Sequence, residues 1–170
     1  MVKMKKILVP IDLSEYSLEA VEYACGLASG SEAQIYLLHV VPIEQPFAFP
    51  VVDQHSETTL RDLEEKLLAQ LEVFIRRKVC NAKHLVRVIR RGEPSGEIVK
   101  FSKDESIDLV VMATHGRTGV GHVLMGSVAE KVVRHSPVPV LTVKPLLIRE
   151  TLLKEHDIEE QLRLHGQWNK

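Results

Sequence analysis

Short apolar runs and helix-like patterns alternate along this chain of 170 residues, and the alternation limits the possible folds more than any other feature. Five apolar runs are typical of strands, at 6–10, 34–40, 85–89, 108–113 and 138–143. Between them, apolar residues recur at helical spacing, as in Leu18, Val21, Cys25 and Ala28, and in Leu60, Leu63, Leu67, Leu71 and Phe74. Strands that alternate with helices predict a parallel sheet covered on both faces.

The predicted fold is a single α/β domain over residues 1–145. We expect a Rossmann-like, doubly wound, five-stranded parallel sheet of strand order 3-2-1-4-5, with helices on both faces. Pro139 near the start of the last run predicts an edge strand. Residues 146–170 are rich in helix formers and predict a C-terminal helical tail that packs on the domain or on a partner. A solvent-exposed helix is the alternative for this tail.

Composition excludes several classes of protein. The net charge of −1 does not favour general binding to nucleic acid or to membrane surfaces. No apolar run approaches the ~20 residues that a membrane-spanning helix needs. Cys25 and Cys80 match no metal or redox spacing, so we expect them to be buried or half-buried thiols. The sequence therefore predicts a cytoplasmic protein.

A glycine-rich stretch, 113–127, lies between the apolar run 108–112 and the helix-like run 128–134. In such a loop, backbone N–H groups and the positive end of the helix dipole can surround a phosphate. Ser127 adds a hydroxyl at the expected N-cap. Ligands of parallel α/β sheets sit beyond the carboxyl ends of the strands, where loops 10–12, 39–41 and 113–127 should converge. The sequence therefore predicts a nucleotide-binding protein.

The loop matches neither of the better-known phosphate signatures, because it contains no lysine and no Gly-x-Gly-x-x-Gly. It resembles the universal stress protein family, whose nucleotide-binding members carry Gly-x-x-Gly, nine residues, then Gly-Ser or Gly-Thr. Aligned on Gly126-Ser127, the spacer is 117–125, the second glycine is Gly116 and the first is replaced by Ala113. The resemblance covers roughly 4–144, and it also rests on the segments 6–12, 37–40, 92–94, 108–112 and 137–140.

The resemblance implies a binding site for an adenine nucleotide. Asp12 would lie near the adenine or ribose, and Pro10 and Val40 would wall the adenine, with backbone hydrogen bonds from Val40. The full expected set is Pro10, Ile11, Asp12, Val40, Ala113, Thr114, His115, Gly116, Arg117, Thr118, Gly119, Gly126, Ser127, Val128 and Ala129. Gly116 to Gly119 would wrap the phosphates of ATP, which would supply much of the coordination of a Mg²⁺ ion. The family also implies a homodimer formed through 138–143.

Two of these residues have structural alternatives. Ser127 and Glu130 form a Ser-x-x-Glu pattern, which is sufficient to explain the serine as part of a capping box. Asp12 or Ser14 could cap the first helix without contacting a ligand.

Three charged or titratable residues of the loops are weaker candidates. Arg117 is open to a second reading as a solvated loop charge. His115 and His122 are seven apart and show no recognised metal-ligand spacing. His39 is interpreted as a hydrogen-bonding residue at a strand end rather than a catalyst.

Three functions follow from these patterns. The first is an ATP-binding universal stress protein that acts as a nucleotide-sensing regulator, with at most slow hydrolysis, since no nucleophile with a base is evident. The second is a stress-response adaptor of the same fold that binds no nucleotide, which Ala113 and the long tail favour. The third, a phosphohydrolase, lacks an acid/base constellation.

Overall fold

The computed structural model describes residues 4–30, 33–43, 65–69, 71–73, 85–116 and 125–146. Its labelled elements are β1 (Lys6–Ile11), α1 (Glu15–Ser29), β2 (Gln34–Val41), β3 (Leu85–Arg91), α3 (Pro94–Asp104), β4 (Leu109–Ala113), α4 (Ser127–His135) and β5 (Val140–Val143). Residues 65–69 and 71–73 are also helical, within the helix expected over 60–74.

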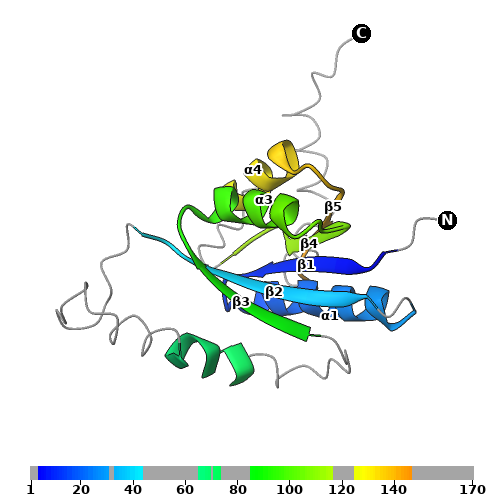
Figure 1. Ribbon diagram of the computed structural model, residues 1–170, viewed down its shortest axis with the longest axis horizontal. Coiled ribbons are helices and arrows are strands. Elements are labelled where there is room, and N and C mark those ends of the chain that lie inside the picture. The colour runs from blue at the N-terminus through cyan, green and yellow to red at the C-terminus, as the bar shows by residue number, and fades with distance from the viewer. Residues whose placement is uncertain are drawn as a thin grey trace, which may run out of the picture.

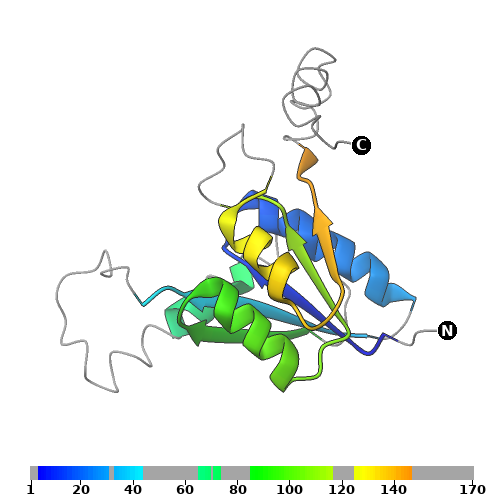
Figure 2. The same cartoon turned by 90° about the horizontal axis from the view of Figure 1, so that it is seen from above.

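The sheet has five strands in the order β3-β2-β1-β4-β5. Every neighbouring pair is parallel, with Ile7 beside Ile35 and Val110 beside Val140. Figure 1 shows α1 on one face of the sheet and α3 and α4 on the other, and Figure 2 shows α3 and α4 from above. The predicted fold class and strand order are therefore confirmed.

Two apolar cores lie on the two faces of the sheet. Alternate residues of β1 point to opposite faces, so Ile7 and Val9 pack on the α1 side and Leu8 packs on the α3 and α4 side. All three side chains are fully buried. Because the strands are buried on both faces, their sequences are continuous apolar runs.

Pro10 lies inside β1, which continues to Ile11 rather than ending at the proline as expected. Asp108 donates its backbone N–H to the carbonyl of Lys6, so the backbone groups of even-numbered β1 residues face β4. The ladder between β1 and β4 ends at the pair Leu8–Val110. An N–H group at position 10 would point toward β4 beyond the last pair of this ladder. The proline therefore removes no hydrogen bond of the ladder, and the strand tolerates it.

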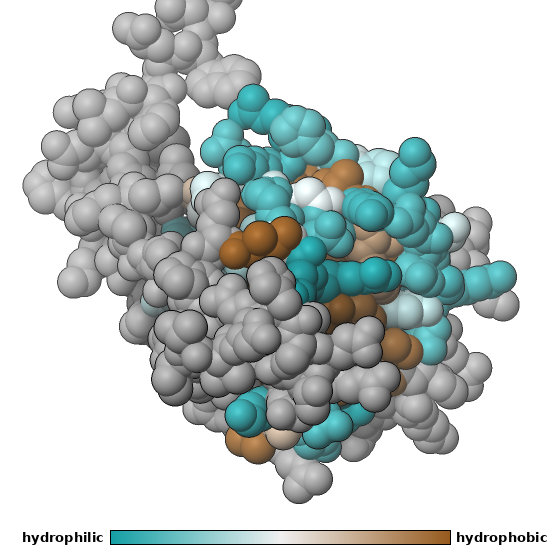
Figure 3. Space-filling model, turned by 60° about the vertical axis from the view of Figure 1, so that its left-hand side comes forward, coloured by the Kyte–Doolittle hydropathy of each residue, from teal (hydrophilic) through white to brown (hydrophobic). Residues whose placement is uncertain are grey.

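The two edges of the sheet are β3 and β5, and Pro139 precedes β5, as expected for an edge. The arginines of β3 have partners, since Arg87 pairs with Glu72 and Arg90 lies 5.7 Å from the centre of the Phe101 ring. Figure 3 shows brown side chains in separate places among teal ones on one face of the molecule. None of the described helices is long and apolar enough to cross a membrane.

Cys25 differs from the expectation drawn from its sequence context. It lies half-buried in α1, as expected, but it is disulfide-bonded, so the prediction of a thiol is wrong for this residue. Helical spacing predicts burial and carries no information about a covalent partner. Cys80 lies outside the described residues.

Candidate functional site

The loops after β1 and β4 meet at the carboxyl edge of the sheet. A Cβ atom added to Gly116, just after β4, would lie 2.6 Å from Oδ2 of Asp12, just after β1. Only a residue without a side chain allows this approach while Asp12 keeps its position. The structure thus brings together two residues that the sequence assigns to one site.

The loop after β1 is fixed by a short hydrogen-bonded turn. Oδ1 of Asp12 accepts the Ser14 backbone N–H at 3.0 Å and the Ser14 hydroxyl at 2.5 Å. Between them, Leu13 has a φ of 64°, a conformation that costs energy for a residue with a side chain. The Ser14 hydroxyl accepts the Ser17 N–H at 3.2 Å and caps α1. Ser14 is therefore the helix cap, and Asp12 holds Ser14 instead of capping the helix.

The segment after β4 is tied to β5. Thr114 donates its N–H to the carbonyl of Val143 at 2.9 Å, and its hydroxyl lies 2.9 Å from Nδ1 of His115. Thr114 and His115 are both buried. These contacts hold the start of the glycine-rich stretch in one place.

The two ends of the glycine-rich stretch are joined directly. The N–H of Gly126 donates to the carbonyl of Thr114 at 2.7 Å. A Cβ atom on Gly126 would lie 3.3 Å from that same carbonyl oxygen, so a larger residue would push the two segments apart. The backbone therefore closes the base of the segment at Thr114 and Gly126. Three expected residues, Arg117, Thr118 and Gly119, lie outside the described residues, as does His122.

The start of α4 differs from the expectation for Ser127. The N-cap is Gly126, no side chain among the described residues caps the helix, and Ser127 is its first residue. The predicted capping box is wrong, because Ser127 lies inside the helix instead of at the N-cap. Glu130 pairs instead with Arg134 at 2.8 Å along the outside of the helix. The first backbone bond of the helix runs from the Glu130 N–H to the Gly126 carbonyl. The N–H groups of Ser127, Val128 and Ala129 precede that bond, at the positive end of the helix, where they can accept an anion.

The end of β2 places a backbone carbonyl at the same edge. Gln34 of β2 donates its N–H to the carbonyl of Lys5, on the β1 side. Backbone groups alternate in direction along a strand, so those of Val40, another even-numbered residue, also face β1. The last pair of the ladder between β1 and β2 is Ile11–His39, so the carbonyl of Val40 lies beyond the end of β1. The side chain of Val40 packs in the core on the α3 side. Val40 can therefore contact a ligand through its backbone.

Three further residues lie at the ends of β1 and β2 and hold this edge in place. Pro10 and Ile11 are buried at the end of β1. Nδ1 of His39 donates to the carbonyl of Ile11 at 2.9 Å, which joins β2 to β1. The interpretation of His39 as a hydrogen-bonding residue at a strand end is confirmed.

Ala113 causes no backbone strain where it stands. It is the last residue of β4, is buried, and is paired with Val143. In the part of the chain that the structure describes, only Leu13 and Ser106 among non-glycine residues have a positive φ. An alanine therefore fits the backbone at this position as readily as a glycine would.

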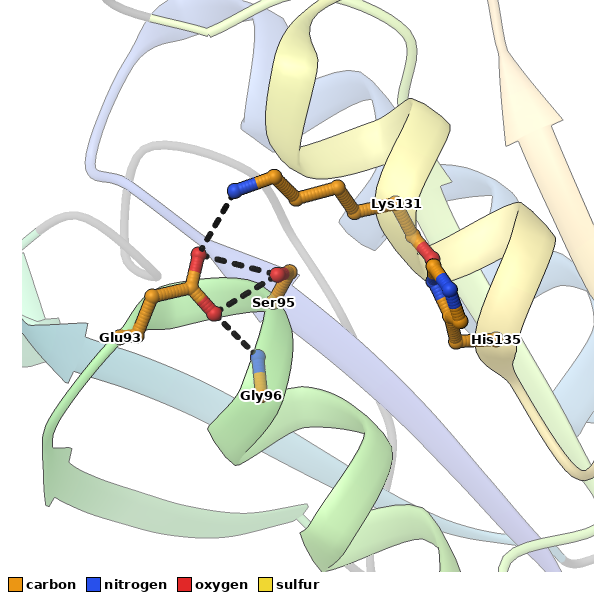
Figure 4. Close-up of polar contacts among 5 residues, drawn as sticks. All are labelled: Glu93, Ser95, Gly96, Lys131 and His135. Carbon is orange, nitrogen blue, oxygen red and sulfur yellow. Dashed lines mark hydrogen bonds and ion pairs between the residues drawn. The ribbon is translucent and has the colours of Figure 1, made fainter.

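Sequence reasoning missed the role of Glu93, which links two helices at this edge (Figure 4). Its carboxylate caps α3, accepting the Gly96 N–H at 2.6 Å and the Ser95 hydroxyl at 2.9 and 2.7 Å. It also lies 3.5 Å from Nζ of Lys131 on α4. The hydrogen bond from Ser95, followed by that from Gly96, lowers the pKa of Glu93 below its ordinary value. The local sequence signal for this capping role was the position of Glu93 between Gly92 and Pro94. Proline favours the first position of a helix, so the residue before it is expected at the N-cap.

We expect Glu93→Gln to change the dependence of stability on pH. The lowered pKa means that the folded state favours the carboxylate, so its stabilisation is present above the pKa of the unfolded chain and is lost as pH falls through the folded pKa. Urea unfolding of both proteins from pH ~7 to ~3 should show the wild-type advantage shrinking below pH ~5. The control is Glu105→Gln, another glutamate beside a lysine. An advantage that stays constant over this range would contradict the assignment.

The described residues contain no group of three or more His, Cys, Asp or Glu side chains that could hold a metal ion. The polar groups at the edge mainly hold each other, as Asp12 holds Ser14 and Thr114 contacts His115. Backbone N–H groups at a helix start are suited to hold an anionic group. A carboxylate on the neighbouring loop can accept hydrogen bonds from hydroxyl groups of the same ligand.

A five-stranded parallel sheet with this order and this carboxyl edge defines a Rossmann-like α/β domain. The chain belongs to the universal stress protein family, whose sequence profile matches residues 3–144. A universal stress protein of Methanocaldococcus jannaschii is 34% identical over 144 residues, which cover 82% of each chain.

Solved structures agree with this assignment. The universal stress protein UspA of Lactobacillus plantarum superposes with a TM-score of 0.68 at 26% identity, covering 84% of this chain and 99% of its own. A universal stress protein solved in complex with cAMP has a TM-score of 0.64 at 25% identity, covering 84% of this chain and 98% of its own. Some members of the fold thus bind an adenine nucleotide.

Proposed function

We propose that this protein binds an adenine nucleotide at the carboxyl edge of β1, β2 and β4, and that the ligand is ATP with Mg²⁺. The ligand state would be read as a signal in the stress response, with at most slow hydrolysis. The observation that carries the proposal is the approach of Gly116 to Asp12, 2.6 Å for an added Cβ. It lies beside a helix start that no side chain of the described ranges caps. The cAMP complex of a related protein supports the class of ligand.

The phosphates would lie against the start of α4. Ser14 caps α1 and Glu93 caps α3, whereas in the part of the chain that the structure describes α4 presents its first N–H groups without a side-chain cap. An anion there gains both hydrogen bonds and the favourable end of the helix dipole. Ser127 is exposed and is not used as a cap, so its hydroxyl is available to a phosphate. Arg117, Thr118 and Gly119 would complete the phosphate contacts.

The nucleoside would lie at the ends of β1 and β2. The carbonyl of Val40 can accept a hydrogen bond from the adenine amino group, and Asp12 can accept one from a ribose hydroxyl. Asp12 is held by Ser14, so little side-chain freedom is lost on binding. Neighbouring Pro10 and Ile11 would support this end of the ligand.

Slow turnover follows from the groups at the edge. Hydrolysis needs a water positioned in line with a phosphate and a group that accepts its proton. Asp12 already accepts two hydrogen bonds at one oxygen, and its other oxygen lies against Gly116. Binding without rapid hydrolysis suits a regulator.

A stress-response adaptor that binds no nucleotide is the second candidate. The replacement of the first motif glycine by Ala113 favours it, and so does the long C-terminal tail. The absence of a positive φ at Ala113 weakens the first of these arguments.

The identity of the ligand can be tested directly on the purified protein. We expect adenine nucleotide to be released when freshly purified full-length protein is denatured, and mass spectrometry will distinguish AMP, ADP, ATP and cAMP. Protein dialysed against ATP and Mg²⁺ and then desalted is the positive reference. A dialysed sample that releases no adenine nucleotide would favour the adaptor.

We also propose that the protein is a homodimer formed through β5. This strand is an edge of the sheet, and Leu141 on it is 38% exposed. A bare edge strand exposes unpaired N–H and C=O groups, which a second copy can satisfy. The neighbouring Val133 and Leu146 are also exposed apolar residues and would add to the buried surface.

A further inference from the structure

The chain after β5 runs directly to α1. Leu146 is helical, and its N–H donates to both carboxylate oxygens of Glu19, each at 3.0 Å. Pro145 before it is buried. The first N–H groups of a helix have no partner within the helix, so the Glu19 carboxylate satisfies one of them from a neighbouring element. The last described residues, drawn in orange in Figure 2, are thereby anchored on α1.

An apolar stripe on α1 begins at this anchor. Glu19, Tyr23 and Leu27 are spaced four residues apart and share one face of the helix. Tyr23 is 47% exposed and Leu27 is 37% exposed, whereas Val21 and Ala24 on the other face are buried in the core. Tyr23 and Leu27 are therefore partly exposed to solvent.

The sequence beyond the anchor has the composition needed to cover the stripe. Residues 147–170 lie outside the described residues, and their first eight contain Leu147, Ile148, Leu152 and Leu153. From Glu19 to Leu27 a helix rises about 12 Å, and residues 146–154 of a helix would rise the same distance. The two segments would therefore match in length as well as in starting point.

Charge favours the same arrangement. Over its whole length α1 has three acidic residues, Glu15, Glu19 and Glu22, and no basic ones. Residues 147–154 include Arg149 and Lys154 and a single acid, Glu150. Opposite charges on two neighbouring segments attract each other and favour this pairing over one with another acidic surface.

We propose that residues 147–154 form a helix that packs along α1 and covers Tyr23 and Leu27. The occupant is the tail of the same chain, because the contact between Glu19 and Leu146 already holds its first residue at one end of the stripe. A tethered segment has an effective concentration of about a millimolar or more, which a second copy does not reach in dilute solution. Ile148 and Leu152 would supply the apolar contacts, since they lie on one face of a helix.

Hydrogen–deuterium exchange of the full-length protein tests this proposal. In the wild type, amides of 147–154 should exchange more slowly than in an unstructured chain, and Leu27→Lys should speed their exchange about tenfold or more. The matched control is Val73→Lys, at a 66% exposed position in the helical segment 71–73, which should leave the tail unchanged. Peptides from β1 and β2 should keep their protection in both variants, because both substitutions are at exposed positions.

Three results would overturn the proposal. The first is a tail that exchanges at the unstructured rate in the wild type. The second is a protected tail whose exchange does not respond to Leu27→Lys. The third is protection that appears only as the protein concentration is raised, which would show that a second copy covers the stripe.

Discussion

Replacing Gly116 by valine should strongly weaken nucleotide binding without unfolding the protein. The new Cβ would lie 2.6 Å from Oδ2 of Asp12, so the carboxylate must move and give up its two bonds to Ser14. Loss of the Asp12 contact and of one phosphate contact, at ~1.5 kcal/mol each, corresponds to at least a roughly hundredfold weaker Kd. Isothermal titration calorimetry with ATP and Mg²⁺ measures this change.

The matched control is Gly26→Val in α1. A Cβ atom on Gly26 meets nothing within 4 Å, so this variant should bind as the wild type does. Circular dichroism and thermal unfolding will confirm that both variants are folded. Wild-type affinity in folded Gly116→Val would place the ligand away from Asp12 and Gly116.

Replacing Thr142 by proline should convert the proposed homodimer into a folded monomer. Val110 and Thr114 donate their N–H groups to the carbonyls of Pro139 and Val143, so the odd-numbered residues of β5 face β4. By alternation, the N–H of Thr142 faces the open edge. A proline there removes an edge donor and leaves the bonds to β4 intact.

The expected effect is large because a two-fold axis repeats each contact. Two lost hydrogen bonds at ~1 kcal/mol each, together with the bulk of the ring, should weaken dimerisation at least about thirtyfold. Analytical ultracentrifugation across a dilution series measures it, with Thr142→Val as the control that keeps the N–H. A dimer of unchanged affinity in Thr142→Pro would exclude the β5 edge as the interface.

Much of the fold could be predicted because periodicity reports burial directly. The five apolar runs became the five strands, and α3 begins at Pro94, in agreement with the preference of proline for the first turn of a helix. The ends of strands were less predictable, since they depend on hydrogen bonds to neighbours. The position of Pro10 within β1 is an example, because it depends on where the ladder to β4 stops.

The candidate site was predicted in outline. The errors in the prediction of its local details have physical causes. Ser127 matched the capping pattern, but the extended backbone of Gly126 makes the glycine the N-cap, and Glu130 turns outward to Arg134. The links from Glu93 to Lys131 and from Glu19 to Leu146 join residues 38 and 127 positions apart. Local sequence patterns contain no signal for such contacts, which only the folded arrangement creates.

The most direct test of the proposed function is a calorimetric titration of the full-length protein, stripped of any bound nucleotide, with ATP and Mg²⁺. We predict a clear binding isotherm with one site per chain, and no comparable heat with GTP, because Val40 offers adenine a backbone carbonyl at the ligand edge. The absence of heat at millimolar ATP would contradict nucleotide binding and would indicate that this family member acts through protein partners.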